Sequence, residues 1–269
     1  MSHQRPRSLQ RTRFRGSTLA PWGTTQSRTG THKFGRNGDI STATVPEDIW
    51  DLGGAYPWPD AEEIIALVST SAEDTLTTGT GAWKVKIIGC DGAFNYQEET
   101  VEMDGLTPVN TVNKYFRVWR LGSITAGSVG SNVGNITAAN STDTLAHMAA
   151  LEGSTLMAVY TVPLSDHSQG YDLLEGELLG WSCRVEGGGA TRVSVVLQIR
   201  EQPYGGAVNT GAWRTIDRDE IAPGEPGGHA FLIPTPVSDK ADIRVRVISS
   251  SSNNAVVQAD FDIFVYRPI

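Results

Sequence analysis

The chain has 269 residues, enough for two domains of ordinary size, and its 39% hydrophobic content is low but sufficient for real cores. Glycine is abundant, with 29 residues, and helix-forming stretches are scarce, so the composition favours a β-rich protein with many turns. No run of about 18 apolar residues occurs, so no membrane-spanning helix is expected, and Cys90 and Cys183 alone do not make a disulfide framework.

Charge is distributed unevenly along the chain. The first 38 residues contain eight lysines or arginines and no acidic residue, whereas the whole chain has a formal net charge of −8. The remainder therefore stands at −16. No apolar stretch follows the basic residues, as a secretory signal would require, and Pro6 and Pro21 interrupt the amphipathic helix of an organelle transit peptide.

Residues 1–45 are predicted to form an extended basic arm. A segment of this charge without an apolar period cannot fold alone, but it can become ordered along an acidic surface or on phosphates. Phe14, Trp22 and Phe34 are spaced along it as anchors that dock into a partner or fold back onto the body. The predicted partner-binding residues are Arg5, Arg7, Arg11, Arg13, Phe14, Arg15, Trp22, Arg28, Lys33, Phe34 and Arg36.

Residues 46–140 are predicted to form an N-terminal β-sandwich domain, which begins with a loop up to Asp60. This loop holds three prolines together with Trp50, Tyr56 and Trp58. The prolines exclude both a helix and a central strand. We expect an ordered loop with buried rings, in preference to a carbohydrate-binding platform.

Alternation of apolar and polar residues predicts the strands of this domain. Trp83, Val85 and Ile87 alternate with Lys84 and Lys86, the period-2 pattern of a half-buried strand. Further strands are expected within residues 64–69, 96–103 and 114–121. Strands spaced about ten residues apart, with turn residues between them, indicate a sandwich or barrel.

Residues 141–153 are predicted to connect the two domains as a short helix or a crossing loop, with Leu145, Met148 and Leu151 on one helical face. Residues 154–269 are predicted to form a C-terminal, jelly-roll-like β domain. Its clearest alternating segments are residues 192–200, 242–247 and 257–265. Long alternating strands in antiparallel order are typical of a jelly roll or a related sandwich. We expect residues 201–229 to form a long loop. The fold class predicted is thus all-β, with two sandwich domains behind the arm.

Motifs of catalysis, metal binding and cofactor binding are not apparent. The five histidines, at positions 3, 32, 147, 167 and 229, do not have the spacing of a metal site. Gly187–Gly189 lacks the lysine and the helix of a phosphate loop, and no G-x-S-x-G motif occurs. We therefore expect no catalytic residue, no metal and no cofactor.

The basic arm allows two kinds of partner. The arginines have the charge for phosphate contact, and Phe14 and Trp22 could stack on bases. The acidic body would, however, repel a polyanion. An arm that binds the acidic surface of a protein fits both halves of the charge distribution, so protein contact is favoured over nucleic acid.

Two segments carry a resemblance to a known group of proteins. The first is S-x-x-D-T-x-x-x-G-T-G-A, formed by residues 71–82, and the second is the glycine, aspartate, tyrosine, glutamate and valine at positions 89, 91, 96, 98 and 101. With these motifs the chain resembles virion structural proteins of tailed bacteriophages, particularly marine and cyanobacterial ones. The resemblance covers about residues 32–137, continues loosely to Tyr171, and implies no catalytic residue.

The resemblance and the arm together predict a non-enzymatic virion protein. The first hypothesis is a capsid decoration or cement protein, a homotrimer whose arm staples neighbouring subunits of the major capsid protein or other virion proteins. The expected location is the virion, after synthesis in the host cytoplasm. The second hypothesis is a tail component, an adaptor, fibre or spike that binds the host surface. The third is an enzyme that degrades surface polysaccharide.

Overall fold

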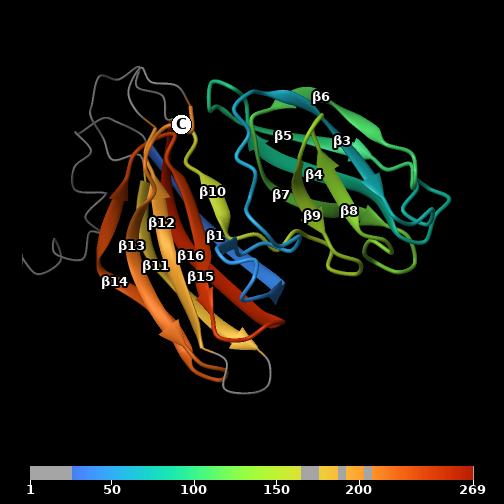
Figure 1. The fold of residues 1–269 in the computed structure, drawn as a ribbon. Coiled ribbons are helices and arrows are strands. Elements are labelled where there is room, and N and C mark those ends of the chain that lie inside the picture. Colours follow the sequence, from blue (N-terminus) through green and yellow to red (C-terminus); the bar gives the residue numbers. More distant parts are fainter. Residues whose placement is uncertain (1–25, 165–175, 187–191, 203–207, 269) are drawn as a thin grey trace, which may run out of the picture.

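The computed structural model describes residues 26–164, 176–186, 192–202 and 208–268. These residues form two lobes built of β-strands, without an assigned helix (Figure 1). Among the described residues, none belongs to a helix long and apolar enough to span a membrane. The predicted all-β fold class, with sandwich domains, is confirmed.

The larger lobe is a sandwich of two four-stranded sheets, extended by one two-residue strand. The first sheet has the order β1 (Gln26–Ile40), β16 (Ala255–Pro268), β11 (Gly176–Glu186) and β14 (Pro226–Val237). The second has the order β10 (Val159–Thr161), β15 (Asp242–Ser250), β12 (Val193–Arg200) and β13 (Arg214–Ile221). The short strand β2 (Glu47–Asp48) pairs with β15 on the side where β10 also pairs.

The larger lobe has the connectivity of a jelly roll. Its first strand pairs with its last (β1 with β16), its second with its seventh (β10 with β15), its third with its sixth and its fourth with its fifth. All four pairs are antiparallel, and successive pairs alternate between the two sheets. This nesting of hairpins is the double Greek key of a jelly roll. Alternate residues of β12, β15 and β16 fill the core between the sheets.

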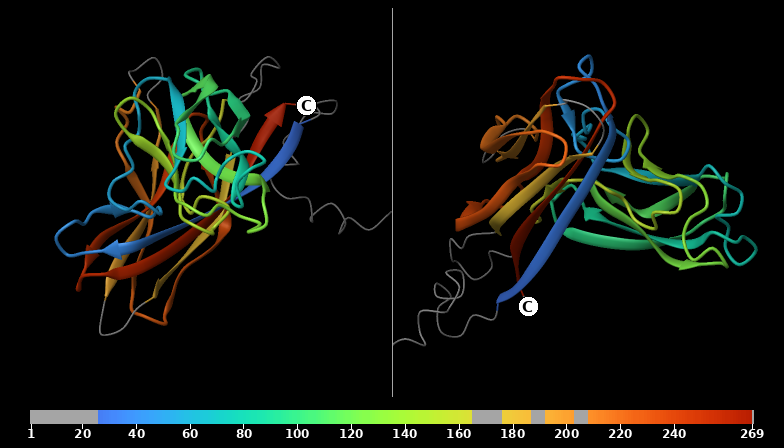
Figure 2. Two further views of the ribbon diagram at one scale, coloured as in Figure 1. Left: turned by 90° about the vertical axis from the view of Figure 1, so that its right-hand side faces the viewer. Right: turned by 90° about the horizontal axis from the view of Figure 1, so that it is seen from below.

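The smaller lobe is inserted between the first and second strands of the jelly roll. One sheet contains β6 (Val109–Tyr115), β3 (Glu63–Ser69), β8 (Ile136–Ala139) and β9 (Thr144–Met148). The other contains β5 (Tyr96–Glu102), β4 (Ala82–Cys90) and β7 (Arg117–Ala126). Both sheets contribute to a separate hydrophobic core, and the lobe lies beside the jelly roll in Figure 1 and in the right-hand view of Figure 2.

Residues 26–40 differ from their prediction as part of the arm, because they form the first strand of the jelly roll. They pair with β16 from Gln26 to Ile40. A hydrophobic period is missing because the buried face of β1 carries Lys33, Gly35 and Asn37. A Cβ at Gly35 would lie 2.3 Å from the Ala158 nitrogen and 2.4 Å from the Ile49 oxygen. The predicted domain boundaries therefore change too. The jelly roll begins with β1, ahead of the smaller lobe in the sequence, and resumes with β10 after it.

Two further segments also differ from their predictions. The connection predicted for residues 141–153 contains β9, whose Leu145 and Met148 are buried in the core of the smaller lobe. Residues 201–229 were expected as one loop, but they contain β13 and the start of β14. In both cases pairing with the preceding strand, β8 for β9 and β12 for β13, outweighs the local turn and helix signals.

Candidate functional site between the two lobes

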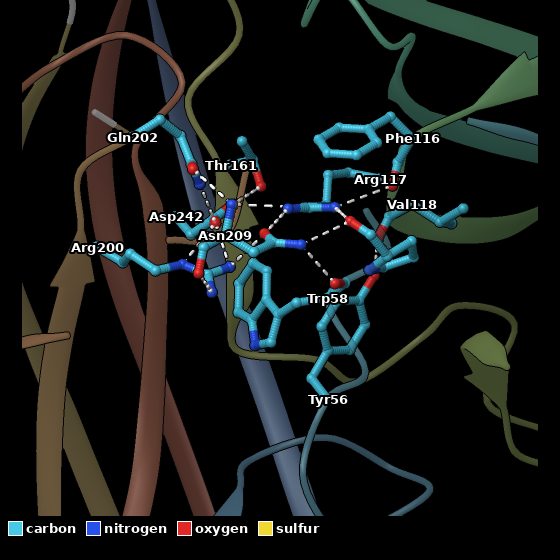
Figure 3. Close-up of polar contacts among 11 residues, drawn as sticks. Tyr56, Trp58, Phe116, Arg117, Val118, Thr161, Arg200, Gln202, Asn209 and Asp242 are labelled. Atoms are coloured by element: carbon cyan, nitrogen blue, oxygen red, sulfur yellow. Dashed lines mark hydrogen bonds and ion pairs between the residues drawn. The ribbon is translucent and has the colours of Figure 1, made fainter. Parts of the chain in front are cut away.

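The two lobes meet along a seam that begins with the aromatic loop of residues 49–60. Trp50, Tyr56 and Trp58 are at most 9% exposed, as predicted for this loop. Their rings stack edge to face, with centroids 5.4 Å apart for the first two and 4.9 Å for the last two. The loop lies between β7 of the smaller lobe and β12 and β15 of the jelly roll, where it carries backbone carbonyls into the seam (Figure 3).

A buried ion pair joins the lobes. Arg117, the first residue of β7, and Asp242, the first residue of β15, are 1% and 0% exposed, and Arg117 Nε lies 3.5 Å from Asp242 Oδ1. Arg200 Nη2 donates to Asp242 Oδ2 at 2.6 Å, and the same carboxylate accepts hydrogen bonds from Thr161 Oγ1 and Gln202 Nε2. The Asp242 carboxylate is therefore fully used as an acceptor (Figure 3).

Asn209 connects this ion pair to the aromatic loop. Its Oδ1 accepts hydrogen bonds from Arg117 Nη2 at 2.6 Å and from Arg200 Nη2 at 2.8 Å. Its Nδ2 donates to the carbonyls of Trp58 and Pro59, at 2.8 and 3.0 Å. The Asn209 amide thus satisfies hydrogen-bond donors and acceptors from both lobes at once.

Aromatic rings cover the arginines of the network. The Arg117 guanidinium lies 3.9 Å from the centroid of Phe116, and that of Arg244 lies 3.8 Å from Trp213. Arg244 and Arg246 pair with Asp48, which is 0% exposed. Burial lowers the pKa of Arg244 to about 10, against the opposing effect of Asp48. The contacts of Arg117 with Asp242 and Asn209 cross between the lobes and make the network a clamp that joins them.

A second site in the seam is a hollow of about 290 Å³ between β1, β10 and the smaller lobe. Lys33 lines it and is 4% exposed, with its Nζ donating to the carbonyl of Trp119. Burial, together with the nearby charge of Arg120, lowers the pKa of Lys33 well below its ordinary value. Tyr96 and Tyr160 flank Trp119, with ring centroids 5.9 and 4.9 Å away. The hollow thus combines cations with aromatic faces.

The residues predicted to bind a partner fall into three groups. Arg5, Arg7, Arg11, Arg13, Phe14, Arg15 and Trp22 lie outside the described residues, as does the side chain of Arg28. The Lys33 side chain is buried between the two lobes. Phe34 and Arg36 are half-buried in β1 on the outer face of its sheet, where Phe34 lines a shallow hollow with Arg184 and Asp260. The structure brings Lys33 to the seam and leaves partner binding by the others as a prediction.

The network of Arg117, Arg200, Asn209 and Asp242 was not predicted from the sequence. The alternation of β15 assigns its charged residues to a polar face, yet Asp242 and Arg244 are at most 6% exposed. That face is covered by Asp48, Trp58 and Trp213, so both faces of the strand are buried. The available signal was the concentration of arginine and aspartate in strongly apolar strands, which makes buried pairing necessary.

The chain was also compared with known proteins. No family model and no curated protein matches it. Among solved structures it is similar to the VP2 subviral particle of infectious bursal disease virus, with 11% identity and a TM-score of 0.24 over 93% of this chain and 79% of that chain. The Gx strain of the same virus gives 10% identity and a TM-score of 0.21, over 91% and 77%. Both TM-scores are low, and neither supports a conclusion about function.

No group of three or more histidine, cysteine, aspartate or glutamate side chains suited to a metal ion is present among the residues that the structure describes. The two cysteines are free and buried. Burial raises the pKa of the Cys183 thiol to about 12, so this thiol is held protonated at neutral pH. The buried arginines and aspartates around Asp242 and Asp48 are engaged with one another, and their arrangement suits structural coupling of the lobes.

Proposed function

We propose that the protein is a non-enzymatic structural component of a virion, a capsid decoration or cement protein of a tailed bacteriophage. In this proposal the basic segment of residues 1–25 binds acidic surfaces of neighbouring subunits of the particle. Its partners would be the major capsid protein or other virion proteins, and the protein itself would form a trimer. It would be made in the host cytoplasm and carried in the particle.

The observation that carries the proposal is the direct continuity between a basic segment and the edge strand of a jelly roll. Residues 1–25 contain five arginines and no acidic residue, and they continue into β1, which pairs only with β16 among the described strands. Jelly rolls are used in viral capsids, although they also serve in lectins and other proteins. Arginine suits the binding of carboxylates because its planar fork donates two hydrogen bonds.

The structure changes how the segment must be tested. A deletion of the first 38 residues would remove most of β1 and expose the core of the jelly roll. A deletion of residues 1–25 leaves β1 complete. A second variant, with glutamine in place of Arg5, Arg7, Arg11, Arg13 and Arg15, keeps the length and removes the charge.

The test is co-sedimentation of the full chain and the two variants with particles stripped of this protein at raised salt. We expect all three to be folded, and both variants to be retained far less than the full chain at an ionic strength of about 0.15 M. Lysine in place of the five arginines should restore part of the retention, because charge is kept while the fork is lost. Equal retention of the truncated and full chains would exclude the stapling role.

The alternative of a tail component is decided by position and copy number in the intact particle. Decoration requires the protein over the whole shell, in many symmetric copies. A tail adaptor, fibre or spike requires few copies at one vertex. An image of the particle with the protein located at the tail alone would replace the decoration proposal by the alternative.

A further inference from the structure

We infer that a protruding bulge of β14, residues 231–234, is the contact by which copies of this chain associate around a rotation axis. The inference rests on the oligomer of the proposed function and deepens it, because it names the surface that joins the copies. It concerns the jelly roll and none of residues 1–25. The bulge and the basic segment can therefore be tested separately.

The bulge interrupts the last strand of the first jelly-roll sheet. Among the described strands β14 pairs with β11 alone, and it lies on the side of the jelly roll away from the smaller lobe (Figure 1). Its residues 226–230 and 235–237 follow the register of β11, whereas the four residues between them stand opposite Leu179 alone. An ordinary β-bulge has one extra residue, so this larger excess makes the strand project from the sheet.

The base of the bulge is packed and its tip is exposed. Phe231 packs against the hydrophobic core of the jelly roll. A Cβ at Gly180 would lie 2.7 Å from Ala230 Cα, so glycine in β11 allows the close approach where the bulge begins. Leu232 is 99% exposed and Ile233 is 62% exposed. Two adjacent apolar side chains are thus held in solvent by a base that is fixed in the fold.

Comparison with β13, the last strand of the second sheet, shows which protection β14 lacks. Five of the eight residues of β13 are charged, which is a common protection of an exposed sheet edge. None of the twelve residues of β14 is aspartate, glutamate, lysine or arginine. Its prolines at positions 226, 234 and 236 remove backbone donors, which hinders the addition of a further strand. β14 is therefore protected against open-ended sheet extension but remains available for contacts through its apolar side chains.

The distribution of charge favours a second copy as the partner. The whole chain has a formal net charge of −8, so two copies repel each other on average. A rotation axis places the same patch on both sides of a contact, so that patch must not repel itself. The charge-free strand β14 meets this requirement. Two carboxylates of the adjacent β13 are engaged within the chain, Asp217 by Trp181 Nε1 at 2.7 Å and Asp219 by the Gly228 nitrogen at 2.9 Å.

The size of the strip sets the strength of the contact. Its exposed residues are Pro226, His229, Ala230, Leu232, Ile233 and Pro236. An interface of standard size uses about 20–30 residues a side and buries roughly 800 Å² per partner. The strip is much smaller, so we expect the chain to be monomeric when dilute and to associate as its concentration rises. Copies held side by side on one shell would associate more strongly, because their effective concentration is high.

Cysteine cross-linking of the full chain tests the contact directly. The natural cysteines are both buried, so Leu232→Cys adds an accessible thiol. Copies that meet at this position around an axis bring the two new thiols within disulfide distance of each other. The matched control is Leu106→Cys, at a leucine of the smaller lobe that is 61% exposed. Under mild oxidation we expect Leu232→Cys to form a disulfide-linked dimer about tenfold faster than Leu106→Cys, because association raises its effective concentration.

Sedimentation equilibrium over a range of concentrations provides a second measurement. Leu232→Asp should weaken the association by about tenfold or more, because it places like charges on both sides of the axis. Leu106→Asp and deletion of residues 1–25 should leave the association unchanged. Both leucines are exposed, so we expect both aspartate variants to keep the unfolding midpoint of the natural chain.

Several results would overturn the inference. These are cross-linking of Leu232→Cys no faster than that of the control, a chain that stays monomeric at every concentration, or association that survives Leu232→Asp. Association that is lost on deletion of residues 1–25 would assign the contact to the basic segment. Loss of Leu232→Asp from stripped particles, without association of the purified copies, would make the bulge a contact for another virion protein and would equally reject the inference. None of these results removes the stapling role, which is decided by the retention of the chain without residues 1–25.

Discussion

The network around Asp242 and the hollow around Lys33 both bury cations between the two lobes, but they treat those cations differently. Arg117 and Arg200 reach the Asp242 carboxylate directly, and Asn209 and backbone carbonyls accept their other donors. Lys33 reaches one carbonyl and faces another cation, Arg120. The first site is complete without any other molecule. The second leaves Lys33 Nζ with one acceptor among the described residues, the carbonyl of Trp119.

The two sites also differ in how the loss of a charged side chain should change the free energy of unfolding. A buried charge with all its partners contributes mainly fixed geometry, and removing one partner leaves the rest uncompensated. A buried charge without a counter-ion is already uncompensated, so its removal should cost the fold little. The two sites therefore predict opposite responses to the loss of one charged side chain.

The largest effect is expected for Asp242→Ala. The substitution leaves Arg117 and Arg200 buried without their shared carboxylate, so we expect the free energy of unfolding to fall by about 3–5 kcal/mol. Chemical denaturation of the purified chain measures it. Asp242→Asn, which keeps the acceptor oxygen, should lose less. A loss below about 1 kcal/mol for the alanine variant would show that the clamp is not a buried charge network.

A smaller loss of stability is expected for Asp74→Ala. This substitution tests whether neutral hydrogen-bond donors alone satisfy a buried carboxylate. Asp74 is 0% exposed and accepts from the backbone nitrogens of Ala82, Val133 and Gly134 at 2.7, 2.8 and 2.9 Å. Removing the carboxylate leaves these donors buried and unpaired, so unfolding should become easier by about 2–4 kcal/mol.

The matched control for Asp74→Ala is Asp60→Ala. Asp60 is an exposed carboxylate of the same chain, and its loss should change the stability by no more than about 0.5 kcal/mol. Equal effects of the two substitutions in thermal unfolding would mean that the contacts of Asp74 are not used in solution.

Asp74 also shows what the sequence could and could not predict. The motif of residues 71–82 was found as a resemblance, and the structure explains it as the turn that holds this carboxylate. A Cβ at Gly81 would lie 2.1 Å from Asp74 Oδ1, so glycine is required there. The strands of residues 82–90, 193–200 and 242–250 were predictable for a different reason: their alternation is local and strong.

The insertion and the seam were not predictable in this way. Strand β1 has polar side chains and glycine on its buried face, and its partner β16 lies more than 200 residues later. Lys33 was assigned to the arm because of its charge. The structure buries it instead, and burial lowers its pKa. A local sequence pattern does not show which strands pair over such distances. It also does not show which face of β15 a second layer of residues will cover.

The smallest effect on the fold, and the sharpest contrast with Asp242, is expected for Lys33→Met. Methionine fills the space of the lysine stem and removes the uncompensated charge, while the Trp119 carbonyl loses its donor. We expect the free energy of unfolding at pH 7 to stay unchanged or to rise by up to about 2 kcal/mol. A fall of more than about 2 kcal/mol would show that Lys33 is already neutralised in the free protein.

The pH dependence of the free energy of unfolding shows whether the Lys33 charge stabilises or destabilises the fold, whatever the size of the effect. The pKa of Lys33 in the folded chain is held below its ordinary value of 10.5, so from that lowered pKa up to about 10.5 the unfolded chain binds more protons. The stability contributed at this position therefore rises with pH across that window. The advantage of Lys33→Met over the natural chain should shrink accordingly as unfolding is measured at rising pH. An advantage that grows with pH would mean that the ammonium group is stabilised by its site.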